Sequence, residues 1–204
     1  MFDAKYLDAA LNLAERMLSQ FWDEAAGGFF YTSGDHETLI ARNKETHDNA
    51  TPSGNSLAAT ALLKLARLTG RMDLEDKAVA TLEMMSGLLN RIPLAAGQSL
   101  IALDFLLGPT HEIVVAERSQ ESGDRSQQEE ESVLERLHQK FVPNKVVHRR
   151  EADITDEQLP VATRSLLSGK RAQQDQTTVY VCQLGTCGVP LVGETQINEG
   201  LARL

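Results

Sequence analysis

The stretch DNATPSGNSLAATALLKLARLTGR, residues 48–71, decides the fold of the first half of this chain. Thr51 and Pro52 fit an N-cap followed by a proline at the first helical position, and Gly70 fits a helix end. Between them the apolar residues recur at helical spacing and form one stripe: Leu57, Ala58, Ala61, Leu62, Leu65 and Leu68. The stretch therefore predicts an amphipathic helix that starts near Pro52 and stops at Gly70.

Helical spacing continues on both sides of this stretch. Before it, the stripe predicts one helix from Tyr6 to Phe21, followed by a turn that Gly27 and Gly28 can make with positive φ. After it, Asp73 can cap a helix over 74–92, and a fourth helix runs from Pro93 to the stop at 108–109. The simplest arrangement of four such helices is two antiparallel hairpins.

Beyond residue 109 the pattern changes to strands that alternate with helices. β-branched runs predict strands over 112–116, 145–148 and 177–182, and helical spacing predicts helices over 133–141, 155–167 and 195–204. Parallel neighbours need such crossovers, so the pattern predicts a small three-layer α/β unit with a short, mostly parallel sheet. We expect the polar run 119–131 to be mobile. The fold class is α+β, with domains at 1–109 and 110–204.

Composition excludes several classes of protein. The 204 residues are 42% hydrophobic and 24% charged, as in ordinary globular proteins, and a net charge of -9 argues against nucleic-acid binding. No apolar run approaches the roughly 18 residues of a membrane span, so no membrane partner is predicted. The first ten residues lack the pattern of a secretory signal, which makes the cytoplasm the default location.

Residues able to do chemistry gather between the first two predicted helices. As catalytic candidates, two of the carboxylates of Asp23, Glu45 and Asp48 could act as general acid and base on a glycoside, or His47 could abstract a proton as in an epimerase. Alternatively, Asp48 shapes the start of the helix and Asp23 fixes the glycine turn through hydrogen bonds to the backbone. Both interpretations stay open on the sequence.

Three polar residues beside these are candidate ligand-binding residues. Asn49, Ser53 and Asn55 lie in the loop or at the opening turn of the helix, where free backbone N–H groups favour anions. No metal site and no cofactor are predicted, because nothing in the spacing of the five histidines matches a ligand set.

The only two cysteines, Cys182 and Cys187, are separated by four residues. This spacing differs from that of the C-x-x-C redox pair, and two cysteines supply half of a tetrahedral zinc site. Three interpretations follow: reduced thiols that pack a strand end, which the sequence favours, a reversible disulfide with redox function, or a site for metal or another ligand.

Several segments together resemble a known family. They are FWDEAAGGFFYT (21–32), KETHDNATPSGNSLAATALLKLARLTGR (44–71), PLAAGQSLIALDFLLGP (93–109), HEIVVAE (111–117), FVPNKVVHRR (141–150) and TTVYVCQLGTCGVP (177–190). The order resembles the C-terminal part of thioredoxin-domain proteins related to spermatogenesis-associated protein 20. The resemblance implies a thioredoxin-like domain followed by an (α/α) toroid similar to six-hairpin glycosidases and N-acylglucosamine 2-epimerases, of which residues 1–109 would be the last two hairpins.

The family pattern departs from this chain in two ways: neither a thioredoxin-like domain nor most of the toroid is present in the 204 residues. Two hairpins alone leave apolar side surfaces exposed, so we expect a homo-oligomer or packing against upstream toroid and thioredoxin-like domains. Two hypotheses remain. The chain is a non-catalytic structural or ligand-binding region, which we favour, or a fragment of a carbohydrate-active or epimerase-like enzyme that takes a carbohydrate-like small molecule.

Overall fold

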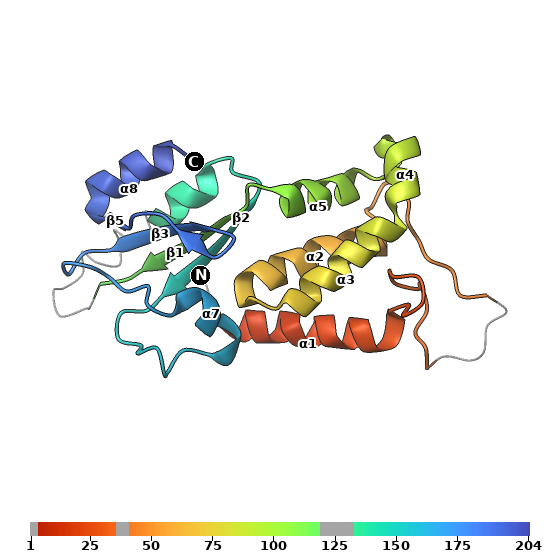
Figure 1. Cartoon of the computed structure of the whole chain (residues 1–204), viewed down its shortest axis with the longest axis horizontal. Coiled ribbons are helices and arrows are strands. Elements are labelled where there is room, and N and C mark those ends of the chain that lie inside the picture. Colours follow the sequence, from red (N-terminus) through yellow and green to blue (C-terminus); the bar gives the residue numbers. More distant parts are fainter. Residues whose placement is uncertain (1–3, 36–40, 119–132) are drawn as a thin grey trace. The chain divides into compact units, whose positions relative to one another are not determined.

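The computed structural model describes residues 4–35, 41–118 and 133–204 (Figure 1). The backbone divides into two compact units, which meet in the sequence between Gly108 and Pro109. The first unit is helical and the second combines helices with a mixed sheet, which confirms the α+β class. The polar run expected to be mobile, 119–131, lies outside the described residues.

The helical unit begins with α1 (Ala4–Phe21) and α2 (Gly54–Thr69). The predicted α1 stripe is shifted at its start: Leu7 is buried, whereas Tyr6 is 66% exposed. The predicted start of α2 is also wrong by two residues, because Ser53 rather than Thr51 is the N-cap and its Oγ accepts from the backbone N–H of Ser56. Gly70 ends α2 in the left-handed conformation, as predicted.

The central helix of this unit is α2, which packs against α3 (Met72–Met84) on one side and α5 (Gly97–Leu107) on the other. Contact on two sides buries more of α2 than the single stripe predicted. Leu63 and Ala66 are buried although they lie off the stripe, while Leu57, at one edge of the stripe, is 50% exposed. Helix pairs at the start of the chain fit the predicted hairpins.

Two helix boundaries differ from those predicted. The helix expected over 74–92 breaks at Met85 into α3 and α4 (Ser86–Arg91), and Asp73 lies in the first turn of α3 without capping it. Pro93 opens a separate 3-10 turn, η1 (Pro93–Ala95), before α5 begins. Met85 is 1% exposed, so the break occurs where a large side chain is held in the core.

The second unit contains β1 (His111–Ala116), β2 (Lys145–Arg150), β3 (Thr178–Gln183), β4 (Thr186–Cys187) and β5 (Leu191–Val192). Its strand order is β2-β1-β3-β4, and β5 also pairs with β3. Among the strands of the described residues, only β1 and β2 are parallel; the β1/β3, β3/β4 and β3/β5 pairs are antiparallel.

The prediction of a mostly parallel sheet is therefore wrong. The expected crossover helix over 155–167 reduces to η3 (Val161–Thr163) and α7 (Arg164–Leu167), preceded by turns. The chain then returns along β1 in the opposite direction. The alternation of predicted strands and helices did not show whether β3 runs parallel or antiparallel to β1. A connection made mostly of turns can lead to either orientation.

Apolar side chains cover both faces of this sheet, in keeping with three layers. On one face, Ile113, Val115 and Val179 pack with residues of the helical segment 133–139 and of α8 (Gly193–Ala202). On the other, Val114 and Tyr180 pack with residues that include Leu166 and Leu167 of α7. Burial on both faces explains why β1 is apolar without alternation. None of the described helices is both long and apolar enough to span a membrane.

Candidate functional site

Three of the predicted site residues, Asp48, Ser53 and Asn55, come together around the first turn of α2. Asn55 is 2% exposed. Its side chain joins two loop segments that lie between α1 and α2 in the sequence, residues 22–35 and 41–53. Its Oδ1 accepts from the backbone N–H of Phe29 at 2.7 Å, and its Nδ2 donates to the carbonyls of Phe29 at 2.9 Å and Glu45 at 2.8 Å. Asn55 therefore binds backbone on both loops with nearly its full hydrogen-bonding capacity.

Asp48 holds the starts of two helices together. One carboxylate oxygen accepts from the backbone N–H of Ser53 at 2.8 Å and from Ser56 Oγ at 2.7 Å; the other accepts from the backbone N–H of Gln98 in α5 at 2.7 Å. Burial acts to raise the pKa of Asp48, but these donated hydrogen bonds outweigh it and keep the pKa below its ordinary value. A carboxylate at two helix starts also faces the positive ends of both helix dipoles.

A chain of buried hydroxyls extends this junction into the core. Ser56 Oγ lies 2.7 Å from Ser53 Oγ and 2.8 Å from Ser99 Oγ, and all three serines are at most 1% exposed. Gln98 adds a second link, since its Nε2 donates to Thr60 Oγ1 at 2.9 Å. Ser56, Gln98 and Ser99 were not among the predicted site residues, because a hydroxyl or amide on a helix carries no signal of the partner that packing brings to it.

Asp23 stabilises the glycine turn. Its Oδ1 accepts from the backbone N–H of Ala25 at 2.9 Å, and its Oδ2 lies 2.7 Å from the Nζ of Lys44. The Lys44 ammonium, assisted by the Ala25 N–H, holds the pKa of Asp23 below its usual range. Lys44 also donates to the carbonyl of Gly27, so one lysine, which the sequence did not single out, ties the turn to the second loop.

The remaining candidates in this loop are exposed. Glu45, His47 and Asn49 all have exposed side chains, and His47 Nδ1 lies 3.3 Å from Thr46 Oγ1. Ser53 and Asn55 are buried and hydrogen-bonded, so they support backbone. The structure thus brings Asp48, Ser53 and Asn55 together at the start of α2, where their contacts match the structural alternative stated for Asp48 and Asp23. Among the residues described, no three His, Cys, Asp or Glu side chains form a potential metal site.

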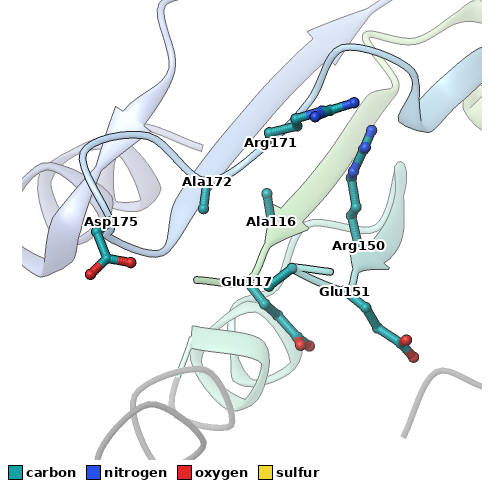
Figure 2. Close-up of a pocket in the computed structure, with 8 residues that line it drawn as sticks. Ala116, Glu117, Arg150, Glu151, Arg171, Ala172 and Asp175 are labelled. Atoms are coloured by element: carbon teal, nitrogen blue, oxygen red, sulfur yellow. The ribbon is translucent and has the colours of Figure 1, made fainter. Parts of the chain in front are cut away.

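A second polar site lies in the α/β unit, where the parallel strands β1 and β2 end. A cavity of about 270 Å³ is lined by Ala116, Glu117, Arg150, Glu151, Ala152, Arg171, Ala172 and Asp175. In Figure 2 the side chains of Arg150 and Arg171 extend toward one end of this site and those of Glu117 and Glu151 toward the other. Carboxyl ends of parallel strands are a common place for ligands, but the arginines here already have an acidic partner.

That partner is Asp156, which lies 2.6 Å from Arg150 Nη2 and 3.5 Å from Arg171 Nη2. Arg150 is 2% exposed and also donates to the carbonyls of Leu167 at 2.5 Å and Ile154 at 3.0 Å. The hydrogen bond from Arg150 lowers the pKa of Asp156 to about 2. Through these contacts Arg150 holds the irregular segment between β2 and β3, residues 151–177, against the sheet.

The two cysteines form a disulfide, Cys182–Cys187. Cys182 in β3 and Cys187 in β4 face each other directly in the antiparallel register, which brings their Cα atoms to 3.9 Å. The interpretation favoured from sequence, reduced thiols that pack a strand end, is therefore wrong. Only the tertiary pairing of β3 with β4 could show this, because a four-residue spacing by itself does not require a hairpin.

Comparison with known proteins gives one consistent group of relatives. No protein-family model matches the chain. Human spermatogenesis-associated protein 20 is 31% identical over 201 residues, which are 97% of this chain and 24% of the human protein. Over nearly its whole length this chain is similar to a part of spermatogenesis-associated protein 20. The rat protein of the same name is 30% identical with the same coverage, and an uncharacterized protein of Caenorhabditis elegans is 26% identical over 197 residues.

The chain spans about a quarter of the length of these curated relatives. The matches cover both compact units, from the helices through the disulfide-bearing hairpin. They are consistent with the predicted likeness to a C-terminal part of spermatogenesis-associated protein 20.

Proposed function

We propose that the chain is a non-catalytic structural region of a larger α-helical assembly. The observation that carries this proposal is the outer face of α5. Leu100, Ile101 and Leu107 are 37%, 56% and 76% exposed, although the opposite face of the same helix is buried against α2. Asp104 is also exposed on this face, but its helical neighbours there, Leu100, Ile101 and Leu107, are all apolar. A helix with so much apolar surface on its outer side is suited to burial against other helices.

We propose that further helices pack against this outer face of α5. Relatives about four times as long have ample chain to supply them, and a toroid packs each hairpin between two neighbours. In the isolated chain a second copy offers the same kind of apolar surface, so we expect self-association through α5. Two of the three candidate catalytic carboxylates, those of Asp23 and Asp48, are engaged by backbone N–H groups or Lys44, which favours the structural role over a carbohydrate-active or epimerase-like fragment.

Light scattering across a concentration series tests the proposal. The wild-type chain should show a molar mass that rises with concentration, and Ile101→Lys should keep it monomeric with an unchanged urea midpoint. The matched control is Leu13→Lys, which alters another exposed leucine (66% exposed) on α1 and should leave association unchanged. A wild-type chain that remains monomeric and binds no hydrophobic dye would contradict the proposal.

A further inference from the structure

We propose that the Cys182–Cys187 disulfide is a reversible thiol–disulfide exchange site, at which a dithiol attacks the sulfur of the exposed residue Cys187. This inference concerns the α/β unit and does not depend on the packing of α5. It rests on the position of the hairpin, on the unequal exposure of the two cysteine residues and on the short loop that they close.

The disulfide lies at an edge of the sheet. β4 is only two residues long, both are exposed, and it pairs with the last two residues of β3. Leu184 and Gly185 connect the strands with φ values of 50° and 76°, as in the two-residue hairpin turn that has two left-handed positions. Since β4 joins the sheet through β3 alone, a reagent can approach it from solvent.

The two cysteines differ sharply in access. Cys182 is 1% exposed and packs in the apolar cluster with Val114, Leu166 and Tyr180. Cys187 is exposed on the outer strand. Exchange requires a thiolate to reach a disulfide sulfur, and the sulfur reached decides which cysteine leaves. Burial therefore directs attack to Cys187 and makes Cys182 the leaving group.

Opening this bond leaves the sheet in place. The cysteines are five positions apart in sequence, so the disulfide closes a very short loop, and short loops constrain the unfolded chain least. β3 stays paired with β1 from Thr178 to Cys182 through a register that does not involve β4. The disulfide thus links two strands, β3 and β4, that are already paired by backbone hydrogen bonds. A disulfide with a mainly structural role more often links elements that are distant in the sequence.

The exchange is a two-electron reaction with a dithiol as reductant. The first thiolate of the dithiol bonds to the Cys187 sulfur, the Cys182–Cys187 bond breaks, and the Cys182 thiolate takes up a proton. The second thiolate then attacks the sulfur that the dithiol had contributed and releases Cys187 as a thiolate, which is also protonated. The products are the oxidised dithiol and two cysteine thiols.

The test is native-state reduction followed by alkylation and peptide mass mapping. With dithiothreitol and no denaturant, we expect complete loss of the disulfide while the circular dichroism spectrum is retained. With limiting glutathione, the mixed disulfide should map to Cys187 and the free thiol to Cys182. A disulfide that resists native reduction and opens only in urea, or a mixed disulfide on Cys182, would overturn the proposal.

Single variants give a second measurement. In Cys182→Ser the remaining thiol is the exposed one, and in Cys187→Ser it is the buried one. We expect the first variant to react with a maleimide about tenfold faster or more than the second, because thiol reactivity depends on exposure. Equal rates in two folded variants would contradict the assignment of Cys187 as the attacked sulfur. Should either variant fail to fold, the mapping on the wild-type protein decides the question.

Discussion

Asp48 accepts a 2.7 Å hydrogen bond from the backbone N–H of Gln98, fifty residues further along the chain. The same carboxylate accepts from Ser53 at the start of α2. One side chain therefore fixes the first turn of α5 relative to that of α2, and the buried serines complete the junction. The loop that carries Asp48 therefore has a structural role in the helical unit, because it holds the first turns of α2 and α5 together.

Replacement of Asp48 by asparagine should destabilise the helical unit. The amide keeps one acceptor but turns an N–H group toward the N–H of Gln98, and the charge that faces two helix starts is lost. We expect the free energy of unfolding to fall by about 2 kcal/mol, which is the range for a hydrogen bond to a charged group. Urea denaturation provides the measurement, and the exposed neighbour Asn49→Ala, expected to change stability by less than about 0.5 kcal/mol, is its control.

Truncation of Asn55 should loosen both loops at once. Asn55→Ala leaves the Phe29 N–H and two carbonyls without their partner in a buried place. Unsatisfied buried polar groups cost about 1–3 kcal/mol each, so we expect a loss of roughly 3 kcal/mol. Limited proteolysis should then cut near 41–49 in the variant before it cuts α2. Cleavage no faster than in the wild-type chain would argue that other contacts hold these loops.

The glycine turn supplies a matched pair of substitutions. Gly28 has φ +74°, and a Cβ there would lie 2.3 Å from Met84 Cε and 3.0 Å from Asn55 Oδ1. Gly28→Ala should therefore cost about 2 kcal/mol or more, from the left-handed backbone together with the clash. Gly87 in α4 has nothing within 4 Å of such a Cβ, and Gly87→Ala should stabilise by up to about 1 kcal/mol. Thermal unfolding of both variants tests the contrast.

Asp156 should give the α/β unit an acid-dependent stability. Its pKa in the folded protein is about 2, because Arg150 holds the charged form, whereas an unfolded aspartate titrates near roughly 4. The folded state then binds this proton more weakly than the unfolded state. The stabilisation is complete above pH of about 4 and is lost as pH falls toward about 2.

Urea midpoints measured across that window test the assignment. Asp156→Asn should lower stability at neutral pH and flatten the acid dependence, while the exposed Glu199→Gln should keep the wild-type slope. If Asp156→Asn retained the full slope between those pH values, other carboxylates would have to account for the acid sensitivity.

Local patterns predicted most of the helices and the three long strands. The stop at Gly70 and the positive-φ turn at Gly27 and Gly28 follow from backbone sterics, which act within a few residues. The same patterns placed the α2 cap two residues early and ran one helix through Met85. Such boundaries depend on which polar groups and side chains the rest of the fold brings to the helix end.

The candidate site divides in the same way. By itself the sequence determined that Asp23, Asp48 and Asn55 lie at helix starts and turns, where short polar side chains bond to nearby backbone. It could not determine that Asp48 reaches Gln98, that Lys44 reaches Asp23, or that Cys182 meets Cys187. Local conformation is set by neighbours along the chain, whereas these contacts arise only when packing brings separate segments within hydrogen-bonding or bonding distance. The antiparallel direction of β3 was likewise decided only by tertiary structure, because the orientation of a strand depends on the neighbour it pairs with and not on its own residues.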